Sequence, residues 1–292
     1  MASLDVRLLG GFEARLDSGQ KVTLPTRKAE ALLAYLALAP GKARSRDQLV
    51  GLLWSDRAET QAKSSLRQAL TALRHGLQEN GSTVLMTEGE SVTLEPGALA
   101  VDVLEFERLA ANGSNGTLAR AERLYRGPLL DGHSVRDPAF NEWLAQERAR
   151  LHELAISAVD RLLAGLLRES DHQAAIATAQ RLLALDPLRE STYRTLMRLY
   201  AEQDQRGLAA RQFERCRDVL SQDLDVEPAP ATRRLYEEIL SSGKGGEANT
   251  ATMFQPAGTA SFGTVDRTAV IRRHQAYICI GYLLIMMRLQ RK

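Results

Sequence analysis

Residues 102–242 carry apolar residues at helical spacing throughout, and we expect this stretch to be entirely α-helical. Shifting it by 34 residues superposes apolar or aromatic residues in four pairs: Leu162 on Leu196, Leu166 on Tyr200, Ala175 on Ala209, and Ala179 on Phe213. A period of this length is typical of tetratricopeptide-like helix pairs. Because only two units match well, we expect neighbouring helices to cover their exposed faces.

The first hundred residues mix strand and helix patterns. The short runs DVRLLG, FEARLD and KVTL alternate as strands do and are separated by the turn formers Gly10-Gly11 and Ser18-Gly19. They predict a small antiparallel sheet. Two helices should follow, one capped by Thr26 and ended by Pro40-Gly41, the next capped by Ser45. A third is predicted over residues 59–77, and TVLMTEGESVTL then predicts a hairpin around Glu88-Gly89.

This order of elements is that of a winged helix. The predicted fold class is therefore an α+β winged-helix domain at residues 1–98, followed by an all-α tetratricopeptide-like domain at residues 99–242, mainly α overall. Residues 243–292 are expected to form a flexible tail with a short apolar segment at 276–287. That segment is shorter than the roughly 20 residues a membrane-spanning helix needs, so membrane attachment is the less favoured interpretation.

The third predicted helix concentrates positive charge in a chain whose net charge is only +2. Leu66, Leu70, Leu73 and Leu77 share one face, and no acidic residue occurs at positions 60–78. A solvated amphipathic helix is the alternative interpretation, but such helices usually mix both signs of charge. A helix that docks through leucines and presents cations suits DNA, whose phosphates attract the charges and whose guanines accept hydrogen bonds from arginine.

The basic edge supplies the candidate DNA-binding residues. On the third helix these are Lys63, Ser64, Arg67, Thr71 and Arg74, of which Arg67 and Arg74 are the best candidates for direct base readout. Arg27, Lys28 and Arg46 lie at the starts of the first two helices, where free backbone N–H groups also favour phosphate, although ordinary surface charge explains them equally well. Trp54, Trp143, Tyr125, Tyr193 and Tyr200 are interpreted as packing residues.

Nothing in the sequence points to catalysis, a cofactor or a metal. The five histidines (75, 133, 152, 172 and 274) show no metal-ligand spacing with one another or with the two cysteines, Cys216 and Cys279. The first residues, MASLDVRLLGG, lack the apolar centre of a secretory signal. We therefore expect a cytoplasmic, non-enzymatic protein without a small-molecule substrate.

The motifs resemble a known family of bacterial regulators. PTRKAEALLAYLAL, SRDQLVGLLW and AKSSLRQALTALRHGL are similar to the OmpR/PhoB-type winged helix. LYRGPLL, FNEWLAQERARL, LDPLRESTYRTLMRLY and DLDVEP resemble the bacterial transcriptional activator domain. The pairing resembles Streptomyces antibiotic regulatory proteins (SARPs). It implies a sequence-specific transcriptional activator that binds repeats near promoters in double-stranded DNA, often as a homodimer, and contacts RNA polymerase.

One departure from the family pattern concerns the wing. Typical members carry basic or aromatic residues near its tip, but here Glu88 and Glu90 occupy it. Acidic residues beside phosphates are repulsive, so the wing is expected to lie farther from DNA or to lower the affinity. The alternative function left open is a tetratricopeptide-like adaptor that binds protein partners, with weak or vestigial DNA binding.

Overall fold

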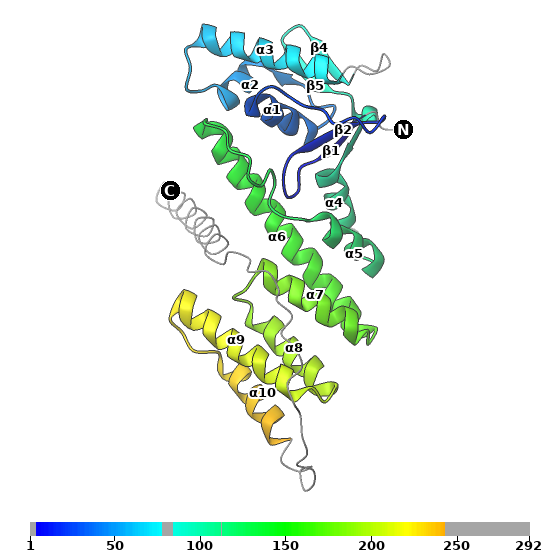
Figure 1. Ribbon diagram of the computed structural model, residues 1–292, viewed down its shortest axis with the longest axis vertical. Helices are drawn as coiled ribbons and strands as arrows, with labels where there is room; N and C mark the ends of the chain where they lie inside the picture. The colour runs from blue at the N-terminus through cyan, green and yellow to red at the C-terminus, as the bar shows by residue number, and fades with distance from the viewer. Residues whose placement is uncertain (1–3, 78–83, 112, 243–292) are drawn as a thin grey trace, which may run out of the picture. The chain divides into compact units, whose positions relative to one another are not determined.

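The computed structural model describes residues 4–77, 84–111 and 113–242. The chain divides into two compact units, Met1–Leu166 and Leu167–Lys292. The tail at residues 243–292, with its apolar segment 276–287, lies outside the described residues. The expected fold class is confirmed: small sheets accompany the first helices, and the rest of the described chain is helical (Figure 1).

The first unit opens with a sheet that sequence patterns predicted only in part. β1 (Leu4–Arg7) pairs antiparallel with β2 (Glu13–Leu16), as expected, but its other neighbour is β6 (Leu99–Val101), which runs parallel to it. The expected third strand at residues 21–24 was wrong: Lys21 makes one isolated bridge with Arg15. Pro25, which follows directly, has no N–H with which to extend a ladder.

The winged helix itself is built as predicted. α1 (Arg27–Ala37) begins at Thr26, whose side chain accepts the N–H of Ala29, and α2 (Arg46–Leu53) begins with a reciprocal capping box between Ser45 and Gln48. α3 (Glu59–Leu77) packs on both of these helices. β4 (Leu85–Glu88) and β5 (Ser91–Leu94) form the hairpin, and β3 (Arg44–Ser45) pairs with β5 on its other side. Gly89 turns the hairpin with φ 56°, a conformation that suits glycine.

Three further helices complete the first unit: α4 (Asp102–Ala111), α5 (Asn115–Leu124) and α6 (Pro138–Arg168), the last of which runs past the boundary at Leu166. Hydrogen bonds connect this helical region to the first sheet. The buried carboxylate of Asp102 accepts the backbone N–H groups of Leu8 and Leu9, at 2.8 and 3.0 Å. Leu130 donates its N–H to the carbonyl of Leu8 at 2.8 Å. The segment after α5 thus pairs with the residues that directly follow β1.

The second unit consists, within its described part, of α7 (His172–Leu185), α8 (Glu190–Glu202), α9 (Arg206–Leu224) and α10 (Pro230–Ser241). The 34-residue period is visible in the backbone, because Ser170 and Asp204, 34 positions apart, both take a left-handed conformation with φ of 56° and 58° just before a helix. α10 is joined to α8 through Glu190, whose carboxylate accepts the hydroxyl of Thr232 at 2.6 Å and the N–H of Ala229 at 3.0 Å.

Packing assignments for the aromatic residues are confirmed. Trp54, Tyr125, Tyr193 and Tyr200 are buried. Trp143 is half-buried and meets the ring of Tyr35 edge-on, with centroids 5.0 Å apart. This contact brings α6 against α1 inside the first unit.

Candidate DNA-binding interface

α3 has the two faces that its sequence predicted. Leu66, Leu70, Leu73 and Leu77 are all buried, together with Ala62 and Ala69. The outer side of the helix, beside this seam, exposes Lys63, Ser64, Arg67 and Thr71. Burying four leucines contributes on the order of 1.5–3 kcal/mol each, which holds the helix on its domain. The outer side is therefore free to meet another molecule.

Arg67 is the exposed cation at the centre of this outer side. Its own carbonyl accepts the hydroxyl hydrogen bond of Thr71 at 3.0 Å, one turn later. Throughout residues 4–77, 84–111 and 113–242, its guanidinium meets no carboxylate or other hydrogen-bond acceptor. A free guanidinium can make the paired hydrogen bonds to guanine O6 and N7 that direct base readout uses.

Lys63 is placed differently, because acidic residues surround it. Its Nζ donates to Glu59 Oε1 at 2.6 Å and lies 3.7 Å from Asp47 Oδ1 of α2. The hydrogen bond and charge of Glu59, and then the charge of Asp47, raise the pKa of the Lys63 ammonium. The helix that looked purely positive over residues 60–78 therefore has its first turns partly neutralised.

Arg74, the other candidate for direct readout, is half-buried. Its Nη2 donates to Thr87 Oγ1 in β4 at 2.8 Å, so it ties the last turn of α3 to the wing. In this arrangement its guanidinium orients the hairpin relative to the helix.

The three candidates at helix starts are all engaged within the protein. Arg27 donates to the carbonyl of Gly132 at 3.2 Å. Lys28 is mostly buried, with Nζ 3.5 Å from Asp56 Oδ1 and 3.7 Å from Asp137 Oδ2. Arg46 Nε lies 3.9 Å from Glu90 Oε2 at the tip of the wing. Glu90 of the acidic wing therefore lies beside Arg46, a cation of the same domain.

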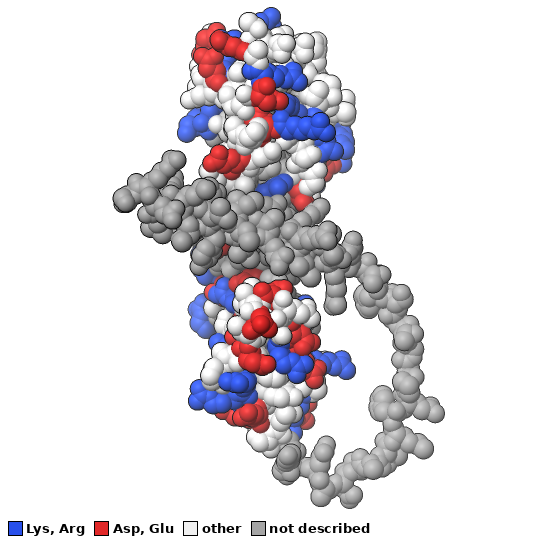
Figure 2. Space-filling view, turned by 90° about the vertical axis from the view of Figure 1, so that its left-hand side faces the viewer, with Lys and Arg blue, Asp and Glu red and all other residues white. Residues whose placement is uncertain are grey.

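A further basic residue was missed by the sequence analysis. Arg57 is exposed in the connection that precedes α3 and donates to Ser65 Oγ at 3.0 Å. A cation beside the start of a helix, where backbone N–H groups are free, suits a phosphate. Figure 2 shows that positive and negative side chains are interspersed on the face it presents.

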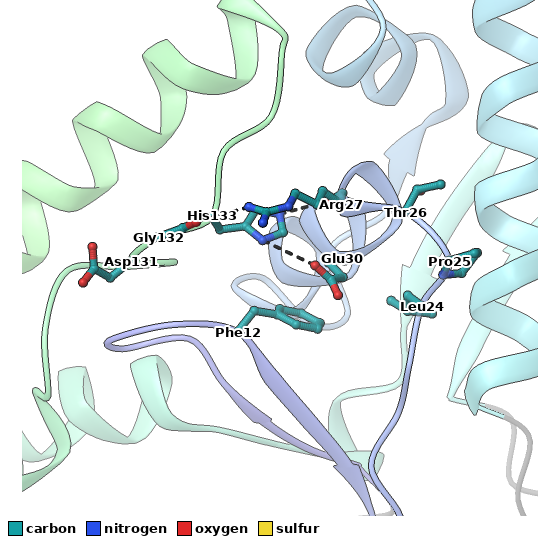
Figure 3. Close-up of a pocket in the computed structure, with 9 residues that line it drawn as sticks. All are labelled: Phe12, Leu24, Pro25, Thr26, Arg27, Glu30, Asp131, Gly132 and His133. Carbon is teal, nitrogen blue, oxygen red and sulfur yellow. Dashed lines mark hydrogen bonds and ion pairs between the residues drawn. The ribbon is translucent and has the colours of Figure 1, made fainter.

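The first unit also has a polar pocket of about 360 Å³ beside the start of α1, lined by Phe12, Leu24, Pro25, Thr26, Arg27, Glu30, Asp131, Gly132 and His133 (Figure 3). Its polar groups bond one another. His133 Nε2 lies 3.0 Å from the carbonyl oxygen of Arg27, and His133 Nδ1 lies 3.4 Å from Glu30 Oε2. These contacts join the start of α1 to the segment at residues 131–133.

Comparisons with known proteins agree with this architecture. The family model of the bacterial transcriptional activator domain matches residues 101–240, and that of the transcriptional regulatory protein C-terminal domain matches residues 19–90. The chain is 27% identical over 254 residues to the transcriptional regulatory protein MoaR1 of Mycobacterium bovis, an alignment that covers 82% of this chain and 79% of that one. It is 28% identical to the regulatory protein AfsR of Streptomyces coelicolor, covering 80% of this chain and 24% of that one.

A third relative is the transcriptional regulator RedD of Streptomyces coelicolor, 27% identical, with 73% of this chain and 64% of that one covered. Among solved structures, Mycobacterium tuberculosis EmbR in complex with a low affinity phosphopeptide has the same fold, with a TM-score of 0.60 and 24% identity. That match covers 83% of this chain and 66% of that one. A winged helix joined to an activator domain defines a DNA-binding transcriptional regulator. More particularly, the two matched domains and these relatives support a SARP-like regulator.

Proposed function

We propose that this regulator reads a specific promoter sequence through the outer side of α3 and activates transcription through its helical domain. Residues 1–98 would bind DNA, residues 99–242 would act on the transcription machinery, and residues 243–292 would be a tail. The observation that carries the proposal is the guanidinium of Arg67, which is exposed beside the buried leucine seam and meets no hydrogen-bond acceptor among the described residues. With the outer side of α3 in the major groove of DNA, this guanidinium would offer a strong hydrogen-bond donor to the base edges.

The side chains of the interface take different roles in this proposal. Arg67 reads a guanine, while Ser64 and Thr71 flank it with hydroxyls that can bond to bases or phosphates. Arg57 contacts a phosphate at the start of α3. Lys63 and Arg46 contribute attraction that their acidic partners reduce. Arg74 holds the wing, Arg27 is bonded to the carbonyl of Gly132, and Lys28 is mostly buried against Asp137.

The experiment that tests the proposal is fluorescence-anisotropy titration of the full chain on duplexes taken from beside its own gene, over a series of salt concentrations. Arg67→Ala is expected to weaken binding to the specific duplex by about 1–3 kcal/mol. Arg123→Ala, which removes an exposed arginine from α5, is the matched control and is expected to bind as the wild type does.

The contrary result would be weak binding that is equal for the wild type, for Arg67→Ala and for every duplex. That result would favour the alternative function, an adaptor that binds protein partners through its helical repeats. The acidic residues Glu59, Asp47 and Glu90 around α3 are the observation in favour of the alternative.

The partners of the activator domain are proposed from the family resemblance. They are RNA polymerase and, on paired repeats, a second copy of this chain. An in vitro transcription assay on a promoter with two repeats tests the first, and the stoichiometry of binding to one and two repeats tests the second. The regulator is proposed to work in the cytoplasm without catalysis.

Over residues 4–77, 84–111 and 113–242, no helix combines the length and the apolar character that a membrane span needs. The same residues contain no group of three or more His, Cys, Asp or Glu side chains arranged to hold a metal ion.

A further inference from the structure

We infer that Asp137, which lies outside the winged helix at the start of α6, is a positioning residue for the DNA-reading helix α3. The inference rests on the proposed function of α3. Residue 137 lies within the match to the activator domain. By this inference, that domain helps to set the position of the helix that reads DNA.

Asp137 is almost completely buried, and its carboxylate is bonded on both oxygens. Oδ2 accepts the backbone N–H of Ser55 at 2.9 Å, and Oδ1 accepts the hydroxyl of the same serine at 2.9 Å. Oδ1 also accepts the N–H of Ala139 at 3.2 Å, in the first turn of α6. One carboxylate therefore fastens the beginning of α6 to Ser55 of the winged helix.

Ser55 lies in the short connection between α2 and α3. Trp54 ends α2, Arg57 donates its N–H to the carbonyl of Trp54 at 3.2 Å, and the carbonyl of Ala58 accepts the N–H of Ala62 at 2.9 Å. The chain is thus turned tightly from Ser55 into the first turn of α3. Because a helix moves as a rigid element, a shift at this connection displaces Arg67 as well. Contacts from a supporting shell are what keep a recognition side chain within a fraction of an ångström of its target.

The charge of Asp137 is needed as well as its shape. Lys28 Nζ is buried without a hydrogen-bond partner among the described residues, 3.7 Å from Asp137 Oδ2 and 5.7 Å from the centre of the Trp54 ring. The other nearby carboxylate, Asp56 at 3.5 Å, is about half exposed. If the Asp137 charge is removed, the buried ammonium of Lys28 keeps only the carboxylate of Asp56, whose charge is screened by solvent. A buried cation without a buried counter-charge is unfavourable.

Asp137→Asn keeps the size of the side chain and removes its charge, and Asp56→Asn is the matched control, because Asp56 faces the same amine. The full-length proteins are titrated against the specific duplex and an unrelated duplex of equal length. Asp137→Asn is expected to bind the specific duplex about tenfold more weakly, comparable to one mismatched base pair. Its binding to the unrelated duplex should be unchanged, and Asp56→Asn should remain within about twofold of the wild type.

Hydrogen exchange without DNA separates the two proposals. In Asp137→Asn, the amides of residues 55–62 are expected to exchange faster, while those of β1 and β2 keep their wild-type rates. If no duplex distinguishes the wild type from Arg67→Ala, the proposed function fails, and the exchange measurement still decides whether Asp137 positions α3.

Three outcomes would overturn the inference: equal effects of the two aspartate substitutions, unchanged specific binding by a folded Asp137→Asn protein, or faster exchange spread evenly over the first unit. If Asp137→Asn does not fold, Ser55→Ala takes its place, because it removes only the hydroxyl bond to Oδ1. Ser55→Ala should show the same local change in exchange, and wild-type exchange at residues 55–62 would overturn the inference.

Discussion

Arg74 of α3 and Thr87 of β4 are joined by a hydrogen bond of 2.8 Å between Nη2 and Oγ1, so the reading helix and the wing are fixed to each other at one end of the helix. α3 also packs on β4. The bond is partly buried, which makes it costly to leave the guanidinium without its acceptor.

Thr87→Val removes that acceptor while keeping the branched shape of the side chain. We expect it to lower the free energy of unfolding by about 1 kcal/mol, measured by urea denaturation. Thr93→Val is the control, because Thr93 is half-buried in the neighbouring strand β5 of the same hairpin. Equal loss from both substitutions would mean that the bond to Arg74 adds nothing to stability.

Glu90→Gln is expected to strengthen DNA binding. The carboxylate of Glu90 lies 3.9 Å from Arg46 Nε and adds to the negative charge around Lys63, so its neutralisation frees both cations to attract phosphate. The expected gain is roughly two- to fivefold, the scale of an exposed ion pair, with a steeper dependence on salt. Glu88→Gln, on the same wing, removes the same charge without the contact to Arg46 and should have a smaller effect. Weaker binding by Glu90→Gln would contradict the prediction.

Asp102 gives the first unit a pH-dependent contribution to stability. Burial raises the pKa of its carboxyl, against the opposing effect of the hydrogen bonds from Leu8 and Leu9. A raised pKa means that the folded state binds the proton more tightly than the unfolded state does. The stability that this proton uptake contributes is present below the ordinary pKa and is lost as pH rises through the raised pKa.

The comparison that checks this is wild type against Asp102→Asn, whose side chain does not titrate. The difference in unfolding free energy should favour the wild type more at about pH 3.5, below the ordinary pKa of an aspartate, than at about pH 7. Urea midpoints at both pH values measure it. If the difference in unfolding free energy does not change with pH, the pKa of the Asp102 carboxyl is not raised by folding.

The thiol of Cys216 is expected to be unreactive in the folded protein. The residue is fully buried, and burial, followed by the nearby charge of Glu190, raises the pKa of its thiol to about 12. Almost no thiolate, the reactive form, is then present at neutral pH. In a Cys279→Ser protein, a colourimetric thiol reagent should react slowly under native conditions and rapidly in denaturant. Rapid reaction of the native protein would contradict this.

Features that depend on neighbours along the chain could be predicted from the sequence. Thr26 and Ser45 cap their helices because a hydroxyl can reach backbone N–H groups three residues on. The leucines of α3 share a face because of helical periodicity, and the left-handed residues Ser170 and Asp204 repeat with the 34-residue period. The sequence by itself thus determined the winged helix, the helical-repeat domain and which side of α3 is buried.

The partners of the charged side chains were decided by the tertiary structure alone. Asp47 and Glu90 reach Lys63 and Arg46 from other elements, and Lys28, a candidate phosphate contact by its position in the sequence, faces the buried carboxylate of Asp137 more than a hundred residues away. β6 likewise joins β1 across the whole winged helix. Periodicity says which side of an element is buried, but it carries no information on which distant element covers that side. Charge and hydrogen-bond partners depend on that packing, so they are determined only when the chain folds.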